Sequence, residues 1–160
     1  MKKLIALVLS LALCLCAVSA LAESVDTVTS ASLADYYADA ALTGEDLMNA
    51  INSYSGYYTI TTADAEGNPN VGFFIYGMVE KDGEYYLQFG LASNLTRDNL
   101  VNTGKAIAVY AAAPTDKPYA VAGARMWCEL VTDEALLSEL NTTGSETVLF
   151  FHVTEVRSLG

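Results

Sequence analysis

The sequence is poor in the residues from which many active sites are built. Its 160 residues include one His, three Cys and eight Lys or Arg against 19 Asp or Glu. Cys14 and Cys16 fall in an apolar N-terminal run, so Cys128 is the single thiol of the remaining chain and has no disulfide partner there. With one His and one such Cys, a transition-metal site would depend on carboxylates, which disfavours structural zinc. Catalysis by Cys128 with His152 is conceivable, but a buried inert thiol is the simpler interpretation.

Local catalytic signatures are missing as well. The chain has no G-x-G-x-x-G, G-x-S-x-G, C-x-x-C or H-E-x-x-H, which disfavours four common classes of enzyme. The acidic pairs Glu45-Asp46 and Asp133-Glu134 stand at expected helix starts, where capping explains them better than a two-carboxylate hydrolase does. We therefore predict no metal site and name no catalytic residue.

The N-terminal segment is typical of an export signal. Lys2 and Lys3 precede an apolar run, Leu4 to Val18, and Ala20-Leu21-Ala22 places small residues where a signal peptidase reads them. The run is short for a membrane span, which needs roughly 20 residues. We predict a cleaved signal over residues 1–22 and an exported protein, extracellular or in the cell envelope; a retained anchor is the alternative.

The rest of the chain is strongly acidic. Without residues 1–22 it keeps 138 residues, all 19 acids and six bases, a formal charge of −13. Nucleic acid and anionic membrane surfaces are poor partners for such a chain, since both require clustered Lys or Arg. Residues 23–43 are rich in Ser, Thr, Ala and Asp and are interpreted as a spacer, and residues 44–160 as one domain.

In residues 44–160 the pattern of apolar and polar residues favours strands over helices. A helix is expected from Thr43 or Gly44 to Gly56, and short helices are expected at 93–100 and 133–140. Six strands are expected, at 57–62, 71–79, 84–89, 106–113, 119–131 and 146–156. Tight turns between the early strands indicate an antiparallel meander. The predicted fold is mainly β (α+β), a six-stranded antiparallel barrel with short flanking helices.

The segment from Ser93 to Leu100 contains Arg97, the basic residue that says most about a possible ligand. Arg97 lies in the first turn of a helix that follows a strand, where free backbone N–H groups and the hydroxyl of Ser93 or Thr96 could join it on an anion. A guanidinium can donate two parallel hydrogen bonds to phosphate oxygens. The alternative is an exposed Arg97 paired with Asp98 or another acid.

The second predicted strand is apolar on both faces. Val71 to Gly77 would place one face against the barrel core and the other against a partner subunit or a flat ring. Gly72 and Gly77 would permit close backbone approach. A core strand buried in a dimer without ligand is the alternative. Trp127 is interpreted as a core residue or as a ring-stacking one, and Arg125 shares its strand face, where a cation–π pair could form.

The order of these elements resembles the flavin-binding split barrels related to pyridoxamine 5'-phosphate oxidase. The resemblance runs from Gly56 to about Val156, roughly 100 residues, and depends on order rather than on one strict signature. The segments that carry it are Tyr57 to Thr62, Asp64-x-x-Gly67-x-Pro69-Asn70-Val71, Tyr85 to Phe89, Ser93 to Leu100, Lys105 to Tyr110, and Val121-x-Gly123-x-Arg125-x-Trp127-x-Glu129 through Glu134.

The resemblance implies a six-stranded split barrel that forms a homodimer and binds FMN in a groove between subunits. It implies that Ser93, Thr96 and Arg97 hold the phosphate. For the ring it nominates Gln88 and the backbone of the second strand, namely Asn70, Val71, Gly72 and Phe73. Many members carry Lys near position 96 and Arg on that strand, where this chain has Asn70, Gly72 and Phe73.

Three functional hypotheses follow. The first is an exported FMN-dependent oxidoreductase of unassigned substrate, in which the cofactor supplies the redox chemistry. The second is a barrel that binds haem or a related tetrapyrrole, for which His152 is the one available imidazole. The third is a non-catalytic exported dimer that binds a protein partner through its acidic surface.

Overall fold

The computed structural model describes residues 38–112 and 121–159. The predicted signal segment, most of the predicted spacer and the predicted turn around residues 114–118 lie outside these residues. Where the spacer is described, residues Ala38–Ala40 form one 3-10 turn, η1. None of the helices within 38–112 and 121–159 is long and apolar enough to cross a membrane.

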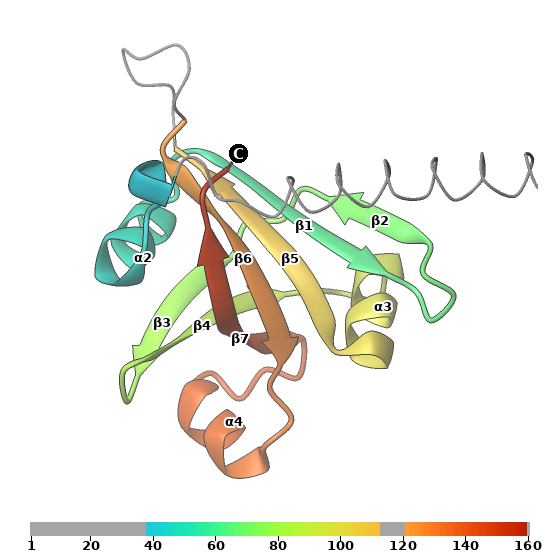
Figure 1. Cartoon of the computed structure of the whole chain (residues 1–160). Helices are drawn as coiled ribbons and strands as arrows, with labels where there is room; N and C mark the ends of the chain where they lie inside the picture. Colours follow the sequence, from blue (N-terminus) through green and yellow to red (C-terminus); the bar gives the residue numbers. More distant parts are fainter. Residues whose placement is uncertain (1–37, 113–120, 160) are drawn as a thin grey trace, which may run out of the picture. The chain divides into compact units, whose positions relative to one another are not determined.

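The domain is one antiparallel sheet with three α-helices (Figure 1). In chain order the elements are α2 (Gly44–Asn52), β1 (Tyr57–Ala63), β2 (Pro69–Gly72), β3 (Gly77–Lys81), β4 (Glu84–Gly90), α3 (Leu95–Thr103), β5 (Lys105–Ala111), β6 (Gly123–Leu130), α4 (Glu134–Leu140) and β7 (Val148–Arg157). The strands are ordered β2-β1-β5-β6-β7-β4-β3 in the sheet, and every neighbouring pair is antiparallel. The predicted class is confirmed.

The predicted count of six strands is wrong, because the expected strand 71–79 is two strands. β2 ends at Gly72 and pairs with β1, whereas β3 begins at Gly77 and pairs with β4 at the opposite edge of the sheet. Phe73 to Tyr76 form the connector. Phe73 and Ile75 point outward while Tyr76 is buried, which produced the apolar pattern on both faces.

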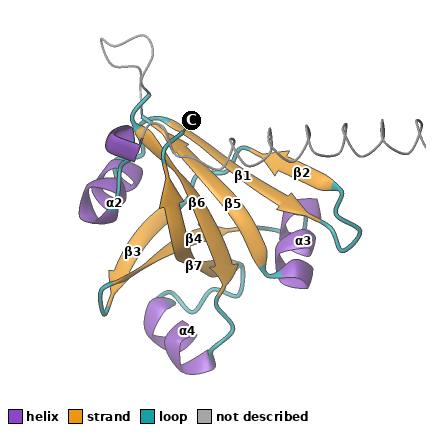
Figure 2. Ribbon diagram, viewed as in Figure 1, coloured by secondary structure: helices purple, strands orange, loops and turns teal. Residues whose placement is uncertain are grey.

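The short connector forces the sheet to curl. The two edges of a flat seven-stranded sheet would lie about 29 Å apart, at about 4.8 Å per strand spacing. Five Cα–Cα steps from Gly72 to Gly77 reach at most about 18 Å. The edges must therefore approach each other, which gives the curved, incompletely closed barrel of Figure 2.

Helices close the core from different sides. Leu47 and Ile51 of α2, beside β3, and Leu100 of α3, beside β1 and β2, are fully buried in the main cluster with Met126 and Phe151. A second cluster beneath α4 contains Tyr86, Val131, Leu140 and Phe150. The barrel is thus filled by its own side chains, as expected for a small β-barrel.

Local capping explains where α3 stands. The Asn94 side chain accepts a hydrogen bond from the Arg97 backbone N–H at 2.9 Å, so Asn94 caps the start of the helix. Gly104 ends it in the left-handed conformation, with φ of 69°. These two residues place Thr96, Arg97 and Asn99 between β1, β2 and the loop that precedes β7.

Candidate functional site

Thr96, predicted for the phosphate, is hydrogen-bonded to Asn70, predicted for the ring. The Asn70 amide donates to the Thr96 hydroxyl oxygen at 2.9 Å, which joins β2 to the first turn of α3. Asn99 of the same helix donates to Thr62 of β1 at 3.1 Å. Thr62, Thr96 and Asn99 are each at most 4% exposed. This polar cluster is a closed, buried link between the helix and the sheet.

Arg97 is directed away from that cluster, toward backbone carbonyls. Its Nη1 donates to Leu91 O at 3.0 Å and to Thr147 O at 3.2 Å, and its Nη2 donates to Glu146 O at 3.1 Å. The guanidinium therefore ties α3 to the end of β4 and to the loop before β7. Ser93, the third residue predicted for the phosphate, is exposed. The structure brings Thr96 to Asn70 but does not gather Ser93, Thr96 and Arg97 around one point.

The other described cations are engaged too. Lys81 pairs with Asp82 and Glu139, and hydrogen bonds to these carboxylates, that of Glu139 first, raise its pKa to about 12. Lys105 lies 3.7 Å from Glu129, and Arg157 pairs with Glu155. Arg125 donates from Nε to Ser158 O at 2.6 Å. Every Lys and Arg within the described ranges has a partner inside the chain.

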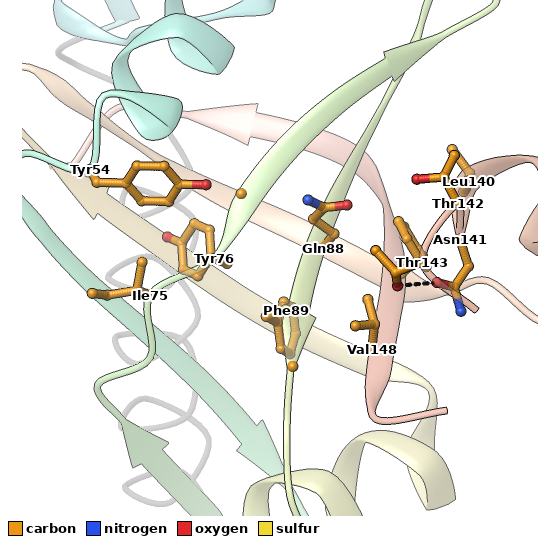
Figure 3. Close-up of a pocket in the computed structure, with 13 residues that line it drawn as sticks. Tyr54, Ile75, Tyr76, Gln88, Phe89, Leu140, Asn141, Thr142, Thr143 and Val148 are labelled. Carbon is orange, nitrogen blue, oxygen red and sulfur yellow. Dashed lines mark hydrogen bonds between the residues drawn. The ribbon is translucent and has the colours of Figure 1, made fainter. Parts of the chain in front are cut away.

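A pocket of about 240 Å³ opens where β3 and β4 meet the connector (Figure 3). We call it the β3–β4 pocket. It is lined by Tyr54, Ile75, Tyr76, Gly77, Gln88, Phe89, Gly90, Leu140, Asn141, Thr142, Thr143, Val148 and Phe150. None of these residues is charged. The pocket is therefore suited to an uncharged group with aromatic character and a few polar edges.

Two polar side chains in this pocket have unused hydrogen-bonding capacity. The Gln88 amide makes no hydrogen bond with any described residue, and Figure 3 shows it in the view between Tyr76 and Thr143. The Tyr76 hydroxyl is buried and has no hydrogen-bond partner, and desolvation is the main reason that its pKa is raised. An unpaired buried hydroxyl costs about 1–3 kcal/mol, so its retention invites an explanation.

Beside the pocket runs a row of exposed apolar residues, which we call the apolar ridge: Val71, Phe73 and Ile75. Their side chains are 64, 79 and 67% exposed, and Ile75 also lines the β3–β4 pocket. Gly72 lies within the ridge, and a Cβ on it would stand 2.2 Å from the Phe74 ring. The close approach that we predicted at Gly72 is therefore already made by the protein's own Phe74. The ridge leads from Asn70 to the pocket that contains Gln88, and both of these residues were predicted to contact the ring.

A second hollow, of about 370 Å³, lies on the outer face of β1, β5 and β6. Its apolar lining includes Ile107 and Trp127, with Lys105 and Glu129 nearby. Trp127 is half-buried on this face rather than in the core. The predicted Arg125–Trp127 cation–π contact is present at 5.9 Å, and Arg157 lies over the same ring at 5.0 Å.

His152 and Cys128 offer little as reactive groups. The Nε2 of His152 lies 2.9 Å from a carboxylate oxygen of Glu84. Cys128 is 3% exposed, and burial raises its thiol pKa to about 12, so the thiol is protonated near neutral pH. Among the described residues no group of three or more His, Cys, Asp or Glu could hold a metal ion.

Sequence reasoning missed part of the pocket. Tyr76 was interpreted as one more strand residue, and its orphan hydroxyl depends on packing that no local pattern encodes. Asn141 and Thr143 reach the pocket from a loop more than 50 residues beyond Gln88. Of the lining residues, Gln88 was singled out through the family resemblance and Gly77 for the close backbone approach that it permits.

Solved structures share this fold, although no protein-family model and no curated protein sequence matches the chain. An FMN-binding protein from Syntrophomonas wolfei is 17% identical with a TM-score of 0.53, over 88% of this chain and 97% of that one. HupZ of Group A Streptococcus is 19% identical with a TM-score of 0.51, over 74% of this chain and 100% of that one. At this identity the likeness establishes the fold, and the split barrel implied by the sequence resemblance is confirmed.

Proposed function

We propose that this split-barrel chain is an exported flavin-binding protein that takes FMN at the β3–β4 pocket and the apolar ridge. The observation that carries the proposal is the unengaged side-chain amide of Gln88, in a pocket that has no charged residue and that Tyr76 and Phe89 line. The heteroaromatic edge of a flavin offers hydrogen-bonding groups for such side chains, and its flat face suits the apolar residues around them.

The size of the pocket indicates how much of the ligand it would enclose. Sites that bury a small molecule usually measure roughly 300–1,000 Å³. A pocket of about 240 Å³ would take one end of a ring system. The remainder would lie over Ile75 and Phe73, whose side chains are 67 and 79% exposed. Without a ligand or partner to cover them, such large exposed apolar side chains are unfavourable in water.

The redox chemistry in this proposal belongs to the flavin, which carries out one- and two-electron transfer when bound. The chain's own residues would orient the ring and exclude water from its inner edge. No Asp, Glu, His, Lys or Arg lines the pocket, so no side chain there is assigned as a proton donor at neutral pH. We therefore propose a flavin-dependent oxidoreductase without naming its substrate.

Two further parts of the proposal concern assembly and location. The Trp127–Ile107 face of β1, β5 and β6 carries half-buried apolar residues and a hollow, and it suits a second copy of the chain. Homodimerisation would be measured by sedimentation. The basic start, apolar run and small residues of positions 1–22 support export, and N-terminal sequencing of the secreted protein tests the cleavage.

Titration of FMN into purified protein tests the proposal. We expect saturable quenching of flavin fluorescence, and at 100 times the dissociation constant a stabilisation of about 2.7 kcal/mol. Gln88→Leu should weaken binding by about fivefold, since one hydrogen bond contributes roughly 1 kcal/mol. Asn102→Leu, at an exposed site outside the pocket, is the matched control and should bind as the native chain does. Unchanged fluorescence and stability of the native protein would contradict flavin binding.

A further inference from the structure

The Lys and Arg residues that the structure describes all contact other groups of the protein. The five described Lys and Arg side chains are paired with carboxylates or backbone carbonyls, and none lines the β3–β4 pocket. Lys117, the sixth base beyond residue 22, lies outside the described residues. A phosphate group that carries up to two negative charges is normally held by at least one such cation.

Arg97 is the one base of the predicted phosphate site, and three of the five N–H donors of its guanidinium are used within the protein. Two hydrogen bonds leave from Nη1 and one from Nη2, all to backbone carbonyls. Turning the guanidinium toward an anion would leave the carbonyls of Leu91, Glu146 and Thr147 without this donor. Arg97 is therefore a structural clamp, which holds α3 to the end of β4 and to the loop before β7.

The first turn of α3 is occupied in the same way. The Asn94 side-chain oxygen takes the Arg97 backbone N–H, which is a group that an anion at a helix start would use. The Thr96 hydroxyl accepts from Asn70 and is 4% exposed. Asp98 follows Arg97 directly in the sequence, and the Glu146 backbone carbonyl accepts from the Arg97 guanidinium, on a chain whose formal charge is −11. Both the contacts and the net charge disfavour an anion here.

From these observations we infer that the site binds the uncharged ring of a flavin and that contacts with the phosphate contribute little to the affinity. Riboflavin therefore binds about as well as FMN. The inference rests on the proposed flavin function and specifies its ligand class. It separates ring recognition, through Gln88 and the neighbouring aromatic residues, from recognition of the phosphate, for which the described residues offer no free cation.

Arg97 then has a different role, as a positioning residue. Its contacts to Glu146 and Thr147 hold the segment that leads into Val148, and Val148 lines the pocket together with Thr143. The backbone bond from Leu91 N–H to Thr147 O, at 3.0 Å, holds the same junction. Loss of Arg97 should loosen the wall of the pocket and weaken every flavin by the same factor.

The decisive experiment compares riboflavin with FMN on the native protein, by fluorescence titration at about 20 mM and about 300 mM NaCl. We expect dissociation constants within fivefold of each other and a ratio that does not change with salt, because screening acts on charge contacts. An FMN preference greater than fivefold would overturn this inference while it supports the proposed function. Failure of both flavins to bind would overturn the proposed function, and the inference with it.

Variants of two arginines extend the test. Arg97→Gln should weaken riboflavin and FMN equally, whereas Arg157→Gln removes the same charge outside the pocket and should weaken neither. A selective loss of FMN affinity in Arg97→Gln would show that Arg97 binds phosphate and would overturn the inference. If circular dichroism shows that Arg97→Gln is unfolded, the comparison of the two flavins on the native chain decides alone.

Discussion

The two edges of the sheet, β3 and β2, differ in how far other residues of the chain cover them. At the β3 edge, the Asn52 side chain donates to Met78 O at 2.7 Å and accepts from Met78 N–H at 2.9 Å, as a neighbouring strand would. Helix α2 covers this edge with Leu47 and Ile51, which are fully buried. At the β2 edge, Val71 and Phe73 remain largely exposed.

The difference indicates what each edge is for. Unpaired strand edges invite association, and proteins usually block them. Here one edge is sealed by an amide and a helix, while the other carries an apolar ridge that leads into an uncharged pocket. The chain covers the β3 edge with its own residues and leaves the β2 edge uncovered. We interpret the uncovered edge as the binding surface of the proposed function.

The largest expected contrast uses the same substitution at the two places. Ile51→Ala, at a fully buried position of α2, should lower the free energy of unfolding by about 2–5 kcal/mol, through lost burial and the cavity left behind. Ile75→Ala, at a position that is 67% exposed, should change it by less than about 0.5 kcal/mol. Urea denaturation measures both. Equal destabilisation by the two variants would show that the ridge is structural.

A smaller contrast concerns two buried tyrosines whose rings pack 5.1 Å apart. The Tyr58 hydroxyl donates to Ile51 O at 2.7 Å, so Tyr58→Phe should cost about 1 kcal/mol. The Tyr76 hydroxyl has no partner, so Tyr76→Phe should leave the free protein equally stable or more stable. Thermal unfolding of the two variants gives the comparison. Destabilisation by Tyr76→Phe equal to that by Tyr58→Phe would mean that the orphan hydroxyl is paired in solution.

The smallest expected effect tests the seal at β3. Asn52→Ala removes both side-chain bonds to Met78 and should lower stability by about 0.5–1.5 kcal/mol, because water can replace part of what is lost at this partly exposed site. The Met78 amide should exchange its hydrogen faster, while Asn102→Ala should change neither quantity. Unchanged exchange at Met78 would mean that the Asn52 amide does not protect this edge.

Much of the fold was predictable because its determinants are local. The strands at 57–63, 84–90 and 105–111 carry alternating or β-branched residues, and Asn94 caps its helix through its own neighbours. The division of 71–79 was not predictable in this way. Phe73 and Ile75 keep the alternation of a strand although they leave the sheet, since the break depends on which strands β2 and β3 pair with.

The candidate site was less accessible to sequence reasoning. Gln88 was nominated for the ring through the family resemblance, but the hydrogen bond between Asn70, nominated for the ring, and Thr96, nominated for the phosphate, was not predicted. The partners of Arg97 are backbone carbonyls. Because any residue can supply a backbone carbonyl, no sequence pattern predicts these contacts. An Arg at the start of a helix can serve as an anion site or as a clamp, and only its distant contacts separate the two.

The most direct test of the central claim is to locate flavin on the protein by recording ¹H–¹⁵N correlation spectra during titration with FMN. We predict that the Gln88 side-chain amide and the backbone amides of Gly77 and Gly90 shift together and saturate with one dissociation constant. Shifts confined to Ile107 and Trp127 on the outer face, or no saturable shift at all, would contradict the assignment of the β3–β4 pocket as the flavin site.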